Sequence, residues 1–259
     1  MTGAPLARRR VLVTRPREQA SALAALILEA GGEPILFPAI EIASPADPDR
    51  FHGIADRLEQ FDLAIFISPT AVQRTFDLLH ARDPGSRWPG HLRVAAIGGG
   101  SGRELERQGF TAVLVAPGDA DSEALLASPE LGDVRGKGIV IFRGEGGREL
   151  LGDTLAARGA RVEYAQSYRR ARPSVSATEP AWARKALDAV TVSSSEGLAN
   201  LDALLRAWRR DWLRESPLFV PHARVAAQAA RLGASETIVA GPGDSETARA
   251  LIAYFGGAK

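Results

Sequence analysis

The sequence contains no cysteine, one methionine and four histidines among its 259 residues. The absence of cysteine excludes disulfides, thiolate catalysis and metal or iron–sulfur sites built on cysteine, and it fits a reducing cytoplasm. The four histidines, His52, His80, His91 and His222, lie in different segments. Because they lack the close spacing of a zinc motif such as HExxH, we expect no metal site.

A strong net charge and a long apolar run are also missing. The 32 Lys and Arg residues balance 31 Asp and Glu residues, which excludes a global field that would attract nucleic acid or an anionic membrane. The first apolar run, Val11–Thr14, is far below the roughly 18 residues that span a bilayer, and it is too short for the core of a signal peptide. We therefore expect a cytoplasmic monomer that contacts neither nucleic acid nor membrane and binds anions only locally.

Four segments of the first half of the chain recur, in the same order, in the second half. The pairs are VLVTRP with IVIFRG, FISPTAV with VSSSEGL, the glycine run at 98–102 with the segment at 219–222, and VAPGD with VAGPGD. Four matches in one order indicate a duplicated unit rather than chance.

Each copy alternates a short β-branched run with a segment of helical periodicity, as in VLVT followed by SALAALILEA. This rhythm predicts βαβ units and a parallel sheet. Since the apolar runs show little alternation, helices should cover both faces of that sheet. The chain is longer than a usual domain of roughly 100 to 150 residues. The sequence therefore predicts two α/β lobes of the flavodoxin or Rossmann type.

The loops that follow the predicted strands are the candidate ligand sites, because open α/β sheets bind ligands at the carboxyl ends of their strands. Many of these loops carry Gly, Ser or Pro before a helix, which leaves backbone N–H groups at the positive helix end for an anion. Ordinary βα turns have the same composition. The loops lie at 15–17, 68–70, 98–102, 117–119, 143–147, 193–197, 221–224 and 242–244.

Two glycine-rich loops fall short of nucleotide-binding motifs. The run that begins at Gly98 does not complete a dinucleotide fingerprint, because Arg103 occupies the position of its third glycine. The loop at 143–148 lacks the GxxxxGK[ST] pattern of a phosphate loop. We expect no nucleotide cofactor.

With these segments in place, the chain resembles the uroporphyrinogen-III synthases over nearly its full length. The motifs that carry the resemblance are VLVTRP, LFPAIEI, FISPTAV, RGEGGRELL, the pair Tyr168-Arg169 and SSSEGL. The resemblance implies two α/β lobes joined by a two-stranded connector, with the substrate between the lobes and no cofactor. It implies one lobe at 1–37 plus 173–259, the other at 43–163, and connector strands at 38–42 and 164–172.

The activity that the resemblance implies is the cyclisation of hydroxymethylbilane, with loss of water and inversion of ring D, by a cofactor-independent hydro-lyase of heme and tetrapyrrole biosynthesis. It implies that Tyr168 is the catalytic residue, which hydrogen-bonds or protonates the leaving hydroxyl of ring A. The substrate carboxylates would be held by loop residues of both copies. These candidates are Arg15, Ser68, Pro69, Thr70, Gly98, Ser101, Arg143, Gly144, Ser194, Ser195, His222 and Arg224.

Two departures from the family pattern keep other functions open. The segment 220–224 reads VPHAR where the family usually has a glycine-led turn with hydroxyl residues, and Glu196 stands where a small residue is expected. A non-catalytic tetrapyrrole- or polyanion-binding regulatory module fits these changes, and Tyr168 would then pack in the hinge. A two-lobed periplasmic binding protein shares the architecture, but the sequence shows no export signal.

Overall fold

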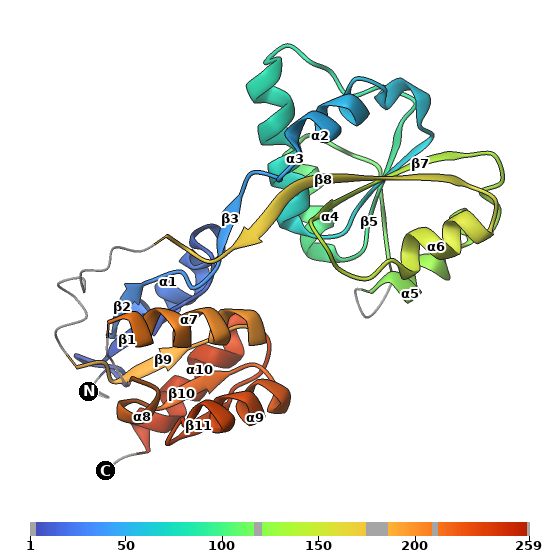
Figure 1. Ribbon diagram of the computed structural model, residues 1–259. Coiled ribbons are helices and arrows are strands. Elements are labelled where there is room, and N and C mark those ends of the chain that lie inside the picture. Colours follow the sequence, from blue (N-terminus) through green and yellow to red (C-terminus); the bar gives the residue numbers. More distant parts are fainter. Residues whose placement is uncertain (1–3, 117–120, 175–185, 209–211, 258–259) are drawn as a thin grey trace. The chain divides into compact units, whose positions relative to one another are not determined.

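The computed structural model describes residues 4–116, 121–174, 186–208 and 212–257 (Figure 1). Contacts divide the chain into two compact units, unit 1 (Met1–Ile42 with Ala171–Lys259) and unit 2 (Ala43–Arg170). Each unit contains a largely parallel sheet with helices on both faces, so the predicted α/β class with two lobes is confirmed. Within the described ranges, no helix has the length and apolar character of a membrane span.

Unit 1 is built on a five-stranded sheet in the order β11-β10-β9-β1-β2, and the strand pairs are parallel. The strands are β1 (Arg10–Val13), β2 (Glu33–Leu36), β9 (Ala189–Thr191), β10 (Leu218–Val220) and β11 (Thr237–Val239). The helices are η1 (Arg17–Gln19), α1 (Ser21–Glu29), α7 (Ser195–Ala207), α8 (Trp212–Glu215), α9 (Ala223–Leu232) and α10 (Asp244–Gly256).

The core of unit 1 lies on both faces of this sheet. Leu12 points to the face that α7 and α9 cover, whereas its neighbours Val11 and Val13 point to the face that α1 and α10 cover. All three side chains are fully buried. This explains why the strand has no polar alternation, since successive side chains of a strand point to opposite faces and both faces here are apolar.

Unit 2 is built on a six-stranded sheet in the order β3-β8-β7-β4-β5-β6. The strands are β3 (Glu41–Ala43), β4 (Leu63–Phe66), β5 (Arg93–Ala96), β6 (Val113–Val115), β7 (Gly138–Gly144) and β8 (Arg161–Ala171). The helices are α2 (Pro48–Ala55), η2 (Leu58–Gln60), α3 (Pro69–Arg82), α4 (Gly99–Arg107), α5 (Ser122–Leu126), η3 (Pro129–Leu131) and α6 (Leu150–Ala157).

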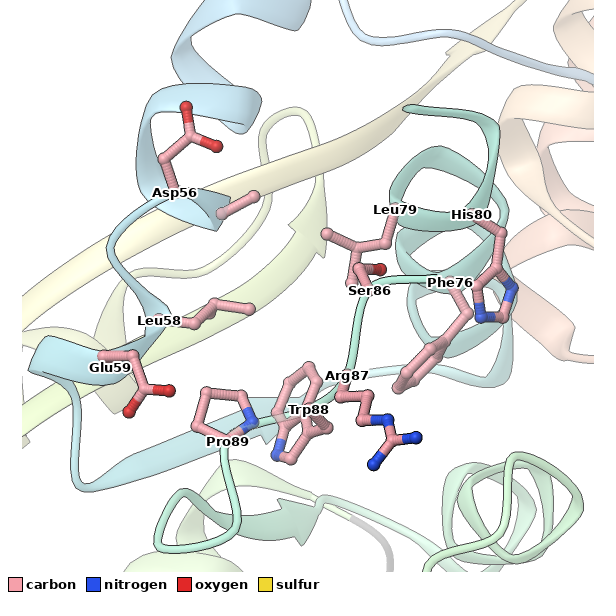
Figure 2. A pocket seen from close by; sticks show the side chains of 11 residues that line it. Asp56, Leu58, Glu59, Phe76, Leu79, His80, Ser86, Arg87, Trp88 and Pro89 are labelled. Carbon is pink, nitrogen blue, oxygen red and sulfur yellow. The ribbon is translucent and has the colours of Figure 1, made fainter. Parts of the chain in front are cut away.

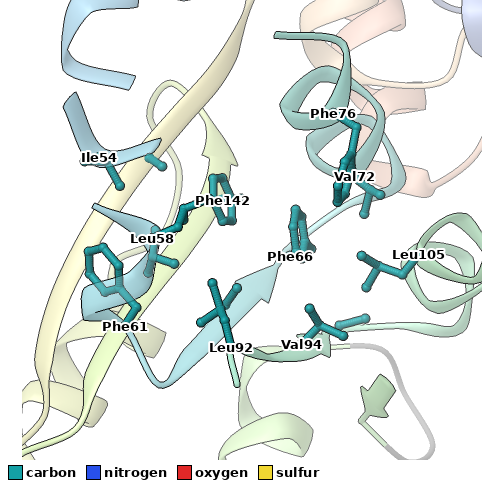
Figure 3. Close-up of a cluster of buried hydrophobic side chains, with 14 of the residues drawn as sticks. Ile54, Leu58, Phe61, Phe66, Val72, Phe76, Leu92, Val94, Leu105 and Phe142 are labelled. Carbon is teal, nitrogen blue, oxygen red and sulfur yellow. The ribbon is translucent and has the colours of Figure 1, made fainter. Parts of the chain in front are cut away.

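One face of the unit 2 sheet is rich in aromatic side chains (Figure 3). Phe66 of β4 stacks on Phe142 of β7 with ring centroids 4.8 Å apart, and Phe76 of α3 lies on the other side of Phe66 at 6.2 Å. Ile65 and Ile141, the neighbours of those strand residues, point to the opposite face, which α5 and α6 cover. Each stacked ring adds specific geometry to a large buried apolar area, so this cluster holds α3 firmly against the sheet.

Each sheet combines strands from both copies of the sequence repeat. By the repeat, β1, β2, β9, β10 and β11 of unit 1 correspond to β7, β8, β4, β5 and β6 of unit 2, and these sets follow the same sheet order. The chain passes from unit 1 to unit 2 within β3 and returns at the end of β8, and these two strands are neighbours in the sheet.

In both units a carboxylate holds the start of an equivalent strand, β7 in unit 2 and β1 in unit 1. In unit 2 the carboxylate of Asp62 accepts the N–H of Gly138, the first residue of β7, at 2.8 Å. In unit 1 the carboxylate of Asp188 accepts the N–H of Arg10, the first residue of β1, at 2.9 Å. Each carboxylate also pairs with the basic residue before that strand. The hydrogen bond from Gly138 is the main reason that the pKa of Asp62 is lowered.

Candidate functional site

Helix α3 begins where strand β4 ends, at the carboxyl edge of the unit 2 sheet. Ser68 is its N-cap: the backbone is extended there (φ −159°, ψ 158°), and Oγ accepts the N–H of Ala71 at 3.0 Å. Pro69 follows at the first helical position, where an N–H would have no intrahelical partner. The Ser-Pro pair is thus a helix start, and it places a hydroxyl at the positive end of α3.

Helix α4 begins beside α3. Its N-cap is Gly98, which makes no side-chain cap bond, and a Cβ built on Gly100 would lie 3.3 Å from Cγ of Pro69. Ser101 lies in the first turn of α4 and is only 3% exposed. The first N–H groups of a helix lack intrahelical partners, so two neighbouring helix starts form an edge that suits an anion.

Tyr168 lies on β8 and is buried, with 4% of its surface exposed. The β7–β8 ladder shifts register here: Arg143 pairs with Gln166, and Gly144 pairs with Tyr168. Such an irregularity redirects the side chains that follow it. The phenolic oxygen lies 3.3 Å from Oγ of Ser68. The fold therefore brings together two residues that the sequence separates by a hundred positions.

Gly144 makes room for the ring of Tyr168. A Cβ built on Gly144 would lie 2.7 Å from Cε2 and Cζ of that ring and 3.1 Å from its hydroxyl oxygen. The next residue, Glu145, donates its N–H to the carbonyl of Tyr168 at 2.9 Å. A side chain at position 144 would displace the phenol, so the absence of one is a structural requirement.

Arg143, a candidate partner for a substrate carboxylate, turns back on its own loop. It is 4% exposed, and its guanidinium donates to the carbonyls of Gly144 and Arg148, each at 3.3 Å. The same group lies 5.0 Å from the ring centroid of Tyr164. Burial raises the pKa of Tyr164 against the opposing effect of Arg143, and a cation over the face of an aromatic ring is attracted by it. Arg143 organises the loop after β7, and its contact with a substrate stays a prediction.

The corresponding helix start in unit 1 has the same cap with a different neighbour. Ser194 caps α7 (φ −160°, ψ 161°), and its Oγ accepts the N–H of Gly197 at 3.0 Å. The carbonyl of Ser195 accepts from Gln228 at 3.1 Å. Two apolar side chains lie beside this first turn: Cδ1 of Ile40 and Cγ1 of Val192 are each 3.8 Å from a Cβ built on Gly197.

Arg15 also makes contacts within its own unit. Its Nε lies 2.9 Å from Oδ1 of Asp244 at the start of α10, an ion pair whose angle is outside the hydrogen-bond range. Its Nη2 donates to the carbonyl of Pro242 at 3.4 Å. With Ser193 and Pro221, Arg15 lines a small hollow at the carboxyl ends of the unit 1 strands. Much of its charge is therefore balanced inside the protein.

The remaining candidates lie at helix starts. Thr70 is the second residue of α3 and is half-buried. His222 is the N-cap of α9 and makes no side-chain cap bond, and Arg224 is the second residue of that helix; both are exposed. The loop at 117–119 lies outside the described residues. In the described ranges, no three His, Asp or Glu side chains are grouped to hold a metal ion.

Two larger hollows of unit 2 lie away from these residues. One is lined by α2, η2, α3 and the segment before β5, including Phe76 and Trp88 (Figure 2). The other lies at the amino ends of β4, β5 and β7 and includes Asp62, Arg93 and Lys137. Neither hollow is lined by a candidate site residue of the sequence analysis. The candidate site is therefore the carboxyl edge of each sheet rather than a deep cavity.

Two residues at these edges, Ile40 and Asp244, are not among the candidates that the sequence indicates. Asp244 lies in the candidate loop 242–244, but no pattern in the neighbouring sequence predicts its ion pair with Arg15. Ile40 has a signal, since it follows Glu33 of β2 by as many residues as Tyr168 follows Arg161 of β8. An alignment of the two sequence copies that extends past the end of β2 places Ile40 opposite Tyr168.

Comparison with known proteins assigns the family. The family described as "Uroporphyrinogen-III synthase HemD" matches residues 21–253. The chain belongs to the uroporphyrinogen-III synthase family. The uroporphyrinogen-III synthase of Escherichia coli (strain K12) is 33% identical over 239 residues, 91% of this chain and 96% of the relative. That of Salmonella typhimurium (strain LT2) is 35% identical over 241 residues, with the same shares covered.

Solved structures of uroporphyrinogen III synthases share the fold. A mutant enzyme from Thermus thermophilus gives a TM-score of 0.56 at 22% identity, over 95% of this chain and 97% of that one. The enzyme from Helicobacter pylori 26695 gives 0.57 at 15% identity, over 95% and 99%. The family model and the relatives confirm the resemblance to uroporphyrinogen-III synthases that the motifs indicate, and the solved structures confirm the fold.

Proposed function

We propose that this protein is a uroporphyrinogen-III synthase that cyclises hydroxymethylbilane, with loss of water and inversion of ring D, in heme and tetrapyrrole biosynthesis. Membership of the family over residues 21–253 supports the activity. The observation that carries the chemistry is the phenolic oxygen of Tyr168 at 3.3 Å from the hydroxyl of Ser68, at the carboxyl edge where α/β sheets bind ligands.

Tyr168 acts on the ring A hydroxyl. The carbon–oxygen bond of that group breaks while the phenol donates its proton, so that water leaves and an electrophilic azafulvenium cation remains beside the phenolate. The substituted carbon of ring D attacks it, and the spiro intermediate fragments and recloses with ring D inverted. The proton released when the last pyrrole regains aromaticity restores the phenol. Water is the only other product and no electrons are transferred, so we class the enzyme as a hydro-lyase that needs no cofactor.

The substrate carboxylates bind mainly to neutral donors at the helix starts. Arg143 is buried against its own loop and Arg15 is paired with Asp244, so neither holds its charge in reserve for the substrate. Helix N-termini attract carboxylates through their unpaired N–H groups. We assign this binding to residues at the helix starts and in the neighbouring loops, with the charged side chain of Arg224 and, as weaker contributors, those of Arg15 and Arg143. The other residues are Ser68, Pro69, Thr70, Gly98, Ser101, Gly144, Ser194, Ser195 and His222.

The balanced charge, 32 basic against 31 acidic residues, supports action without nucleic acid or membrane. We propose that the protein acts as a cytoplasmic monomer on a small-molecule substrate. We also propose that segments 38–42 and 164–172 connect a lobe at 1–37 plus 173–259 with a lobe at 43–163.

The test of the activity is the identity of the product. Purified protein is incubated with freshly prepared hydroxymethylbilane, and the oxidised products are separated by isomer. We expect isomer III to form faster than the spontaneous isomer I. Isomer I alone, at the rate seen without protein, would contradict the enzymatic function and favour a binding module of the same fold.

A further inference from the structure

We propose that Ser68 is a positioning residue for Tyr168: its hydroxyl donates a hydrogen bond to the phenolic oxygen and leaves the phenol proton free for the substrate. This inference rests on the proposed function. It replaces the carboxylate contact assigned to Ser68 under the proposed function, because the single hydrogen of its hydroxyl goes to Tyr168 and Ser68 then acts on the reaction through that residue.

The proton count of the two hydroxyls favours Ser68 as the donor once substrate is bound. A serine hydroxyl has one hydrogen and can accept twice. Oγ of Ser68 accepts from the N–H of Ala71 at 3.0 Å, and its other described contact is the oxygen of Tyr168 at 3.3 Å, in which either oxygen can donate. In either direction one hydroxyl hydrogen has no acceptor among the described residues. When Ser68 donates, that hydrogen belongs to the phenol, where the leaving hydroxyl of the substrate can accept it.

The burial of Tyr168 makes this donor necessary. With 4% of the residue exposed, water gives little support to the negative charge that develops when the phenol loses its proton. A fixed donor aimed at the atom where charge develops stabilises the transition state. Ser68 is such a donor, and it lies at the positive end of the fourteen-residue helix α3.

The backbone sets the distance between the two groups before any substrate binds. Ser68 is fixed as the N-cap of α3, and Gly144 fixes the ring of Tyr168 by close contact. Ser167, the neighbour of Tyr168, makes a long 3.5 Å contact with the carbonyl of Ala71 in the same first turn. The end of β8 is therefore held against the start of α3 at consecutive positions.

Helix capping alone does not require a serine here. In the same unit, Asp47 caps α2 through the N–H of Arg50 at 2.9 Å and is followed by Pro48, as Ser68 is followed by Pro69. An ionised aspartate accepts hydrogen bonds but cannot donate one. Ser68→Asp therefore keeps the cap and removes the donor, whereas Ser68→Thr keeps both.

The experiment measures kcat and KM for isomer III formation in wild type, Ser68→Ala, Ser68→Thr, Ser68→Asp, Tyr168→Phe and the Ser68→Ala/Tyr168→Phe double variant. We expect kcat of Ser68→Ala to fall about 10²-fold, as on loss of one oxyanion donor, with KM nearly unchanged. Ser68→Thr retains most of the rate, Ser68→Asp folds but is as slow as Ser68→Ala, and the double variant is no slower than Tyr168→Phe. Asp47→Ala, which removes a matched cap, lowers the melting temperature by a similar amount and leaves kcat unchanged.

Three results would overturn the inference while isomer III still forms in wild type. These are a KM effect without a kcat effect in Ser68→Ala, full kcat in Ser68→Asp, and effects of the two single substitutions that multiply in the double variant. If wild type yields only isomer I, the proposed function fails and this inference fails with it. Should Ser68→Ala not fold, Ser68→Asp and Ser68→Thr carry the comparison.

Discussion

The two units share a scaffold and differ at the position that faces one helix start. Ser68 in unit 2 and Ser194 in unit 1 cap equivalent helices with the same 3.0 Å bond. In unit 2 the phenol of Tyr168 lies 3.3 Å from the cap hydroxyl, whereas in unit 1 the side chains next to the first turn of the helix, Ile40 and Val192, are apolar. Duplication thus supplied two helix starts with the same cap, and of the two only the one in unit 2 has a phenol at hydrogen-bond distance from its cap. Substitutions at the two helix starts can therefore distinguish an effect on substrate binding from an effect on proton transfer.

Removal of the phenol of Tyr168 should lower the rate of isomer III formation more than any other change. Tyr168→Phe keeps the ring, so we expect little change in stability, but kcat for isomer III should fall about 10²- to 10⁴-fold, the usual contribution of a general acid. The control is Tyr254→Phe in unit 1, which removes a phenol bonded to Glu236 at 2.7 Å and should leave kcat unchanged. An unchanged rate in Tyr168→Phe would assign proton donation to another group.

Displacement of the same phenol should cause the next largest fall in the rate of isomer III formation. In Gly144→Ala the added methyl would lie 2.7 Å from the ring of Tyr168, so the ring must move. A misplacement of roughly 1 Å can cost about 10²-fold in rate, and we expect kcat to fall accordingly in steady-state assays. Gly53→Ala in α2 is the matched control, because a Cβ there meets nothing within 4 Å. Equal kcat in the two variants would show that the position of the Tyr168 ring does not limit the rate.

Loss of the cap in unit 1 should act on binding rather than on rate. Ser194→Ala removes the bond to Gly197 and should cost about 1 kcal/mol of unfolding free energy, as caps usually do. We expect KM to rise, because a carboxylate-binding edge is weakened, while kcat stays the same. A fall in kcat as large as that in Ser68→Ala would show that the effect of a cap on the rate does not depend on the phenol of Tyr168 beside it.

The carboxylates at the strand starts should give the smallest, pH-dependent effect. The pKa of Asp62 is lowered chiefly by the N–H of Gly138, so its contribution to stability is present at neutral pH and is lost as pH falls through that lowered pKa. Asp62→Asn should cost under about 1 kcal/mol at pH 7, because the side chain is 44% exposed, and less near pH 3. Urea unfolding at both pH values measures this difference.

Asp188 sharpens the same test in unit 1. Its side chain is 27% exposed and pairs with Arg9 at 2.7 Å, closer than the 3.1 Å between Asp62 and Lys137. A less exposed and closer pair is screened less, so Asp188→Asn should cost more than Asp62→Asn at pH 7. Equal costs would show that the strand-start bond to the backbone, rather than the ion pair, supplies the stability.

Local sequence patterns were sufficient for the elements and for the family. The apolar runs became the buried strands, the Ser-Pro and Ser-Ser pairs became helix starts, and the duplicated motifs became sheets with one strand order. The motifs around Arg15, Ser68 and Tyr168 were enough to indicate the uroporphyrinogen-III synthases. Such features depend on neighbours within a few residues, which is why they can be read along the chain.

Only the tertiary structure decided what each candidate side chain touches. Arg15 and Arg143 end equivalent strands, yet one pairs with Asp244 and the other is buried against its own loop. The contact of Tyr168 with Ser68 depends on strand order and on a register shift between β7 and β8. These partners are far apart in sequence, so no local preference encodes their meeting, and the packing of both strands against α3 determines it.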